Sequence, residues 1–251
     1  MKRLHVLVLC PLVVPVGATA QVGHAPTGSP FTDLRTNHTI SMQAGYLLGS
    51  GGLLGLGPAD GPIGGVRYEV RVGAPTELSL GFSFADLERS IVDPNLPPEV
   101  RTSGPFRTHM TFVEGAINLN LTGKKAWHRL APYAGVFVGL AFGGTLRTDP
   151  SNFTFDTKFF VGPQLGTRWH LTSKLLIRFE VRDMLWRLSY PSSFEIEDPN
   201  LGFEPPLAAD DPRDQWTHQP VFSIGLGDTF RYWHGILDRR TSPRRRSSVS
   251  R

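Results

Sequence analysis

Two stretches of this sequence alternate between apolar and charged residues, and this alternation limits the possible folds more than any other feature. In residues 177–182 the odd positions are apolar and the even positions charged, in the order Ile177, Arg178, Phe179, Glu180, Val181, Arg182. Residues 66–72 repeat the pattern, with Arg67, Glu69 and Arg71 at the charged positions. A period of two predicts a β-strand whose successive side chains point to opposite faces of a sheet. One apolar face and one charged, self-pairing face are what a β-barrel needs when its outside is lipid.

The period of two recurs in eight segments, and no segment shows convincing helical periodicity. We predict strands over residues 39–48, 64–72, 76–85, 108–121, 130–143, 157–171, 175–186 and 220–233. Three short connections alternate with long loops rich in Gly, Pro and acidic residues, at 49–63, 86–107, 145–156 and 187–219. Such long loops are uncommon in compact soluble domains. The pattern predicts an all-β, eight-stranded antiparallel up-and-down transmembrane β-barrel with short periplasmic turns and long extracellular loops.

Large aromatic residues are expected to form belts at the two rims of this barrel, because their amphipathic rings favour the lipid headgroup region. The periplasmic rim would hold Trp127, Trp169, Tyr232 and Trp233, and the opposite rim Tyr46, Trp186 and Tyr190. The alternative is a soluble secreted barrel of the lipocalin kind, in which the apolar face would point inward.

The first residues predict export. Lys2 and Arg3 precede an apolar run over residues 4–16, and Ala18-Thr19-Ala20 fits a cleavage site. We therefore predict a signal peptide at 1–20, a periplasmic extension at 21–38, the barrel at 39–233 and a basic, disordered tail at 234–251. The single cysteine falls within the signal peptide, so the mature chain would have no disulfide, thiol catalysis or cysteine-bound zinc.

The net charge of +4 is concentrated in the tail, where six arginines stand against one aspartate. A basic tail can indicate a nucleic-acid ligand. Its Ser/Arg-rich composition in an exported chain instead favours a solvated end, and no nucleic-acid partner is expected.

Several segments resemble the small eight-stranded outer-membrane barrels of the OmpA-like, OmpX-like and OmpW-like group. They are Ala131–Gly139, Phe160–Gly166, Arg178–Asp183 and Phe222–Trp233, and the likeness covers about residues 39–233. The resemblance implies a bacterial outer-membrane location, with lipid and lipopolysaccharide around the barrel and the outer-membrane assembly machinery as partners. The chain departs from the pattern by continuing past its last aromatic residue into the basic tail.

A barrel of eight strands is just wide enough for side chains to fill its interior. We predict a lumenal salt-bridge network of Arg67, Glu69, Arg71, Glu77, Glu114, Lys158, Arg168, Arg178, Glu180, Arg182 and Arg231. Charges in this narrow space must pair, because an unpaired buried charge is costly. The hypothesis is a plug that closes the channel. The alternative is a narrow pore or carrier for small solutes, which Tyr133 and Phe137 would obstruct.

The fourth loop is strongly acidic and is the best candidate for a binding surface. Its carboxylates are Glu195, Glu197, Asp198, Glu204, Asp210, Asp211 and Asp214. They predict either a site for divalent cations, which prefer carboxylate oxygens, or a solvated loop. No cofactor is expected.

A rim-located lipid-modifying enzyme is the second functional alternative after the pore or carrier, because some barrels of the resembling group modify lipid A. His109 lies close to Ser103, and His218 borders the fourth loop, but neither has a spacing that specifies a catalytic triad. The sequence favours a non-enzymatic protein with a structural or surface-interaction role.

Overall fold

A computed structural model describes residues 28–144, 149–151, 153–196 and 202–231. The chain divides into two units after Pro30, and the second unit, from Phe31, holds the sheet. Its strands are β1 (Phe31–Asp33), β2 (His38–Leu47), β3 (Gly61–Arg71), β4 (Thr76–Val92), β5 (Thr102–Asn120), β6 (Lys125–Trp127), β7 (Leu130–Gly143), β8 (Thr157–His170), β9 (Leu175–Ser189) and β10 (Asp214–Phe230). A 3₁₀ helix at Ser192–Phe194 follows β9.

Within the described ranges, no helix is long and apolar enough to cross a membrane. The predicted signal peptide, residues 21–27 of the predicted extension and the predicted basic tail lie outside the described residues, as do Tyr232 and Trp233.

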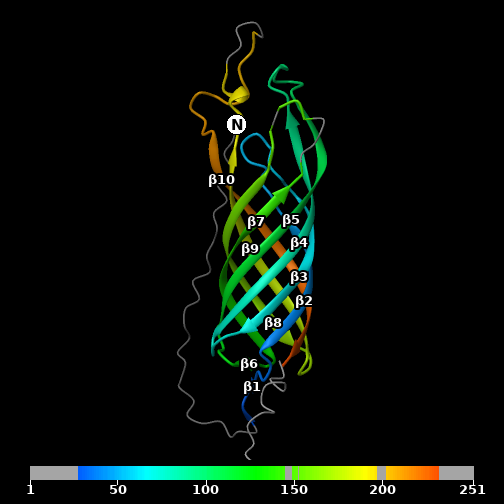
Figure 1. Ribbon diagram of the computed structural model, residues 1–251, viewed down its shortest axis with the longest axis vertical. Helices are drawn as coiled ribbons and strands as arrows, with labels where there is room; N and C mark the ends of the chain where they lie inside the picture. Colours follow the sequence, from blue (N-terminus) through cyan, green and yellow to red (C-terminus); the bar gives the residue numbers. More distant parts are fainter. Residues whose placement is uncertain (1–27, 145–148, 152, 197–201, 232–251) are drawn as a thin grey trace, which may run out of the picture. The chain divides into compact units, whose positions relative to one another are not determined.

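Eight of the strands close into a ring of antiparallel neighbours (Figure 1). Their order is β7-β5-β4-β3-β2-β10-β9-β8, and β8 pairs again with β7. The first and last strands of the ring meet where Tyr46 of β2 pairs with Phe222 of β10. Over the middle of the ring every strand has a hydrogen-bonded neighbour on both sides, so closure removes the free edges that an open sheet would have there. The predicted eight-stranded antiparallel up-and-down fold is confirmed.

The two faces of the ring follow the alternation in the sequence. Outward-facing apolar side chains are highly exposed, such as Met42 at 71%, Leu80 at 67% and Leu165 at 62%. The alternating charged residues point inward, and Arg67 and Glu180 are almost fully buried. The apolar face is therefore the outside of the barrel and the charged face its lumen.

The strands that flank the second and fourth long connections are longer than predicted. β4 and β5 stay paired as far as Val92 and Thr102, so most of the predicted loop at 86–107 is a hairpin. This boundary was wrong because polar outward residues ended the apolar alternation. Arg107 and Asp86 instead form an ion pair on the outer face at 2.5 Å. Likewise, β9 and β10 extend to Ser189 and Asp214, which shortens the fourth loop to residues 190–213.

One turn carries additional structure. β6 lies in the predicted turn between the strands now seen as β5 and β7, and it pairs with β1 from the predicted extension, with Phe31 opposite Trp127. The end of the ring with the connections 72–75, 121–129 and 171–174 is called the turn end below, and the opposite end the loop end.

Candidate functional site: the lumen of the barrel

A first string of ion pairs crosses the lumen around Arg67 of β3. Its Nη1 donates to Oε2 of Glu180 at 2.6 Å, and its Nη2 donates to Oε1 of Glu114 at 3.0 Å. Arg182 donates from Nη1 to the same Glu114 oxygen at 2.6 Å. β3, β5 and β9 are not neighbours in the ring, so these bonds join separate parts of its wall.

A second string lies closer to the turn end. Nη2 of Arg168 is 3.0 Å from Oε1 of Glu69 and 2.6 Å from Oε2 of Glu77. Glu69 also pairs with Arg178, and Glu77 with Arg71 at 2.8 Å. Every guanidinium in the two strings therefore has a carboxylate partner, as a buried charge requires.

Tyr133 of β7 also belongs to this network. The sequence analysis had named it only as a residue that would obstruct a pore. Its hydroxyl donates to Oε2 of Glu180 at 2.6 Å, and the guanidinium of Arg168 lies 4.2 Å from the ring centroid. Gly166 makes room for the ring, because a Cβ at that position would lie 2.5 Å from the Tyr133 hydroxyl oxygen. The signal available in the sequence was the inward position of Tyr133 in its strand.

Two predicted members of the network are not part of it. Lys158 is half-buried at the loop end and, within the described residues, forms no ion pair. Arg231 lies just beyond the end of β10, is exposed, and donates from Nε to the carbonyl of Arg35 at 2.8 Å. Its assignment to the lumen was wrong because the alternation stops where the strand stops. The other nine predicted residues are called the charged half: Arg67, Glu69, Arg71, Glu77, Glu114, Arg168, Arg178, Glu180 and Arg182.

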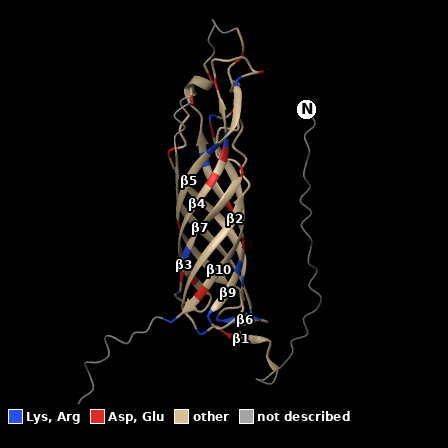
Figure 2. Cartoon of the chain, turned by 90° about the vertical axis from the view of Figure 1, so that its right-hand side faces the viewer, with Lys and Arg blue, Asp and Glu red and all other residues tan. Residues whose placement is uncertain are grey.

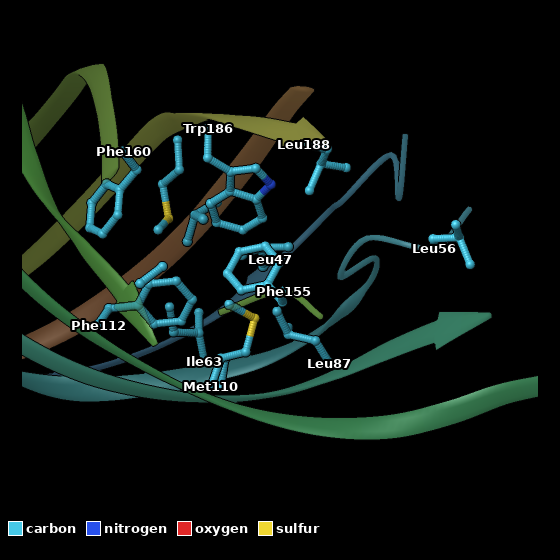
Figure 3. Close-up of a cluster of buried hydrophobic side chains, with 14 of the residues drawn as sticks. Leu47, Leu56, Ile63, Leu87, Met110, Phe112, Phe155, Phe160, Trp186 and Leu188 are labelled. Atoms are coloured by element: carbon cyan, nitrogen blue, oxygen red, sulfur yellow. The ribbon is translucent and has the colours of Figure 1, made fainter. Parts of the chain in front are cut away.

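The loop end of the lumen is apolar, which the sequence analysis did not predict. Buried rings follow one another here, with centroid distances of 5.9 Å for Phe137–Phe160, 5.9 Å for Phe160–Phe112, 6.3 Å for Phe112–Trp186 and 5.4 Å for Trp186–Phe155. Figure 3 shows four of these side chains, Phe112, Phe155, Phe160 and Trp186, gathered in one cluster. Together with Leu47, Ile63, Met110, Met184 and Leu188 the rings from Phe137 to Phe155 are called the apolar half.

The signal for the apolar half was present in the sequence. The inward parity of β9 is charged at Arg178, Glu180 and Arg182 but apolar at Met184, Trp186 and Leu188. This change along one face indicates an apolar lumen toward the loop end. Placing Trp186 and Tyr190 in an aromatic belt was wrong for the same reason, since both are fully buried. Trp127 and Trp169, predicted at the turn-end rim, are exposed.

Segments outside the strands add to the apolar half. Phe153 and Phe155 come from the connection between β7 and β8, Phe194 and Leu207 from the fourth loop, and Leu56 from the first; all five are buried in one cluster. These long connections were predicted as extracellular loops, and part of each of the three packs inward against the cluster.

A buried ion pair fastens the connection between β7 and β8 to the wall. Arg89 of β4 is 2% exposed and pairs with Asp149, and its guanidinium lies 5.2 Å from the centroid of the Phe153 ring. Neither Arg89 nor Asp149 was among the predicted site residues. Arg89 has inward parity in its strand, but its strand was predicted to end at residue 85.

The outer surface has an apolar band with polar limits. On β4 the outward residues Leu78, Leu80, Phe82 and Phe84 are exposed and are followed by Asp86. On the opposite wall, Asp183 and His218 pair at 2.6 Å beyond the apolar residues of β9 and β10. A closed ring with an apolar exterior and a polar interior is the construction of a transmembrane β-barrel, because every backbone group is paired where lipid excludes water.

The acidic residues predicted for the fourth loop do not converge on one point where the structure describes them. Glu195 lies 4.0 Å from Arg213, and Oδ2 of Asp211 accepts from the Ala208 amide at 3.1 Å. Asp214 accepts from Ser189 and Arg187, and these hydrogen bonds lower the pKa of its carboxyl. The remaining predicted members are Glu204 and Asp210, which are both exposed, while Glu197 and Asp198 lie outside the described residues.

No group of three or more His, Cys, Asp or Glu side chains that could hold a metal ion is found in the part of the chain that the structure describes. Divalent cations at the fourth loop remain a prediction.

Two histidine–carboxylate pairs lie on the outer face near the loop end. His218 contacts Asp183 at 2.6 Å, and His109 lies 3.4 Å from Asp86. Among the described residues neither imidazole has a hydroxyl partner, and Ser103 pairs with Ile91 further along the hairpin. A triad needs a nucleophile within hydrogen-bond reach of the base, so neither pair forms one.

Comparison with known proteins gives distant structural likenesses. No known protein family and no curated protein sequence matches the chain. Among solved structures, Neisserial surface protein A shares 11% identity at a TM-score of 0.48, covering 77% of this chain and 97% of that one. The Pseudomonas aeruginosa outer membrane protein OprG shares 10% at 0.43 (78% and 98%), and the N-terminal barrel of OprF from the same organism 9% at 0.43 (78% and 100%). The fold assignment rests on this chain's own strand order and faces.

Proposed function

We propose that this protein is a bacterial outer-membrane β-barrel with a structural or surface-interaction role and a lumen that is closed to solutes. The observation that carries the proposal is the arrangement of two obstructions in series along one lumen. The charged half occupies the turn end and the apolar half the loop end, and the Arg182 guanidinium lies 5.4 Å from the Phe137 ring centroid where they meet. A solute would have to pass both.

Each obstruction opposes permeation for a different physical reason. An ion that enters the charged half must compete for groups such as Arg67 and Glu180, which already satisfy each other, and separating a buried pair is costly. An apolar constriction excludes water and the ions that water carries. Aromatic rings from Phe137 to Phe155 supply such a constriction.

The parts of the barrel beyond the apolar band support the surface role. There the outer face carries cross-strand ion pairs, Arg107–Asp86 at 2.5 Å and Arg187–Asp214 at 2.7 Å. Polar groups on the outside of a strand suit water, sugar or phosphate rather than hydrocarbon. We therefore propose lipopolysaccharide as the immediate neighbour of this surface, lipid as the neighbour of the apolar band, and the outer-membrane assembly machinery as the partner during insertion.

Conductance measurements in planar bilayers test the closed lumen. Wild-type protein, shown to be folded by its faster migration in unheated than in boiled samples on SDS gels, should give no steady single-channel current. The double variant Phe112→Ala/Trp186→Ala removes two rings of the apolar half and leaves the charged half unchanged. It should conduct only if the charged half opens as well. A stable wild-type current would overturn the proposal and favour the narrow-pore alternative.

Folding into lipid tests the location independently of conductance. The mature chain should need detergent or vesicles to fold, because the apolar band must be covered. Arginine in place of Leu80, which lies in the middle of the apolar row of β4, should cost about 2–4 kcal/mol of folding free energy in vesicles. A chain that folds as a monomer in plain buffer would contradict the membrane location.

A further inference from the structure

The turn end of the ring carries a strap whose position is fixed by two arginines. After β1, Nη1 of Arg71 donates to the carbonyls of Leu34 and Thr36 at 3.3 and 3.2 Å. Arg231 donates from Nε to the carbonyl of Arg35 at 2.8 Å. Residues 34–36 are thereby held beside the rim, close to the end of β10 (Figure 1).

A hollow of about 1100 Å³ lies between this strap, the 171–174 turn and the end of β10. Its ionic lining is basic on balance, with Arg35, Arg129, Lys174 and Arg231 against Asp33 and Asp228. Figure 2 shows Lys and Arg positions gathered at this end, around β1 and β6. Within the described residues the side chains of Arg35 and Lys174 form no ion pair, so both cations are available to a ligand.

The lining also includes the imidazole of His170. His170, the last residue of β8, is half-buried, and its Nε2 is buried with no hydrogen-bond partner among the described residues. A buried polar nitrogen without a partner is unfavourable. An anionic ligand in the hollow would give this nitrogen a partner.

The hollow has an apolar side next to the lipid. Phe230 of β10 lines it and is exposed on the outer face of the ring, and Leu34 and Leu171 line it as well. Trp127 and Trp169, both exposed at this end, are suited to the headgroup region. A ligand here would meet cations and apolar side chains at the depth where lipid headgroups lie.

We infer that the hollow binds the phosphate headgroup of an anionic phospholipid in the leaflet at the turn end. Guanidinium and ammonium groups would hold the phosphate oxygens, and the apolar side beside Phe230 would face the start of the acyl chains. The inference rests on the proposed membrane location but not on the closed lumen.

The test compares lipid retention by native mass spectrometry after folding in mixed vesicles of phosphatidylglycerol and phosphatidylcholine. Wild type should retain phosphatidylglycerol preferentially. The double variant Arg35→Gln/Lys174→Gln should lose this preference by about 30-fold, since each basic residue at an anionic lipid surface contributes about a factor of five. The matched double variant Arg101→Gln/Lys158→Gln, which removes two cations from the loop-end part of the chain, should bind like wild type.

Two outcomes would overturn the inference. One is equal phosphatidylglycerol retention by Arg35→Gln/Lys174→Gln and wild type. The other is saturation of the hollow by soluble glycerol phosphate with no preference among lipids, which would make the ligand a free phosphate ester. Heat-modifiability of every variant is measured first, so failure of the membrane location appears as a chain that does not fold in vesicles.

Discussion

In the charged half of the lumen each of the nine side chains forms a carboxylate–guanidinium ion pair, whereas in the apolar half the side chains hold one another by packing. Both halves occupy inward positions of the same strands; β9 supplies Glu180 to the first and Trp186 to the second. Removing one member of the charged half leaves its partner charged and buried, so the loss falls on the whole string. Removing one member of the apolar half leaves a cavity whose cost stays local.

This difference shows that one barrel can close its interior in two ways. Charged pairs specify which strands face each other, because the hydrogen bonds between a guanidinium and a carboxylate form only in a restricted geometry. Apolar packing tolerates exchange of shape more readily as long as volume is kept. The comparison is therefore tested by variants that remove a charge pairing without changing the packed volume much, and by variants that remove volume without breaking an ion pair.

The largest effect is expected for Glu180→Ala. Glu180 accepts from Nη1 of Arg67 at 2.6 Å and from Tyr133 at 2.6 Å, so its loss leaves this guanidinium nitrogen and a buried hydroxyl without an acceptor. Arg67 then has only Glu114 as a carboxylate partner, which it must share with Arg182. The free energy of unfolding should fall by about 4 kcal/mol, measured by urea unfolding in vesicles. Glu99→Ala, in the exposed hairpin tip, is the control and should change little.

A second variant decides whether the loss comes from pairing. Arg67→Met/Glu180→Leu removes both charges and leaves the Arg182–Glu114 pair intact. It should be more stable than Glu180→Ala alone, because replacing both partners with apolar groups avoids the stranded charge. If the losses in unfolding free energy caused by the substitutions at Arg67 and at Glu180 were simply additive, the two side chains would not depend on each other. That result would contradict the comparison and indicate a hydrated lumen.

Trp186→Ala should have the next largest effect, about 3 kcal/mol. The indole is fully buried between the rings of Phe112 and Phe155, and its removal leaves a cavity. The same urea titration measures it. Trp186→Ala and Glu180→Ala should be additive, because the sites share no partner; strong coupling between them would argue against two independent halves.

Tyr133→Phe should cost about 1.5 kcal/mol, the typical worth of a hydrogen bond to a charged group. The ring, which lies against Arg168, is kept, while the bond to Glu180 is lost. In the Arg67→Met/Glu180→Leu background, where the Tyr133 hydroxyl has lost its acceptor, the same substitution should cost nothing or should stabilise the protein. An undiminished cost there would show that the Tyr133 hydroxyl acts through a partner other than Glu180.

The smallest effect is expected for Lys158→Gln, within about 0.5 kcal/mol of wild type. Lys158 has inward parity but forms no ion pair within the described residues, at the end of the lumen where the apolar half lies. Unfolding midpoints compared with Arg168→Gln, which loses two carboxylate partners, measure the contrast. A large loss of stability in Lys158→Gln would show that Lys158 belongs to a lumenal salt-bridge network.

The alternation of apolar and polar residues was enough to predict most of the fold, because the direction of a side chain in a strand depends only on its local position. Eight strands, their order of pairing and the inward position of nine charged residues all follow from it. Strand ends did not follow, as β4 and β5 show, because beyond the apolar band both faces of a strand can be polar and alternation gives no signal.

The sequence by itself determined that the nine residues of the charged half point into a closed ring. The reason is that parity along a strand is a local property. Only the tertiary structure decided that Arg67 meets Glu180, 113 residues away, and that Arg178 meets Glu69. The stagger between strands sets which inward positions share a level, and it arises from the closure of the whole ring. Closure likewise decided that Phe153 and Phe155 complete the apolar half.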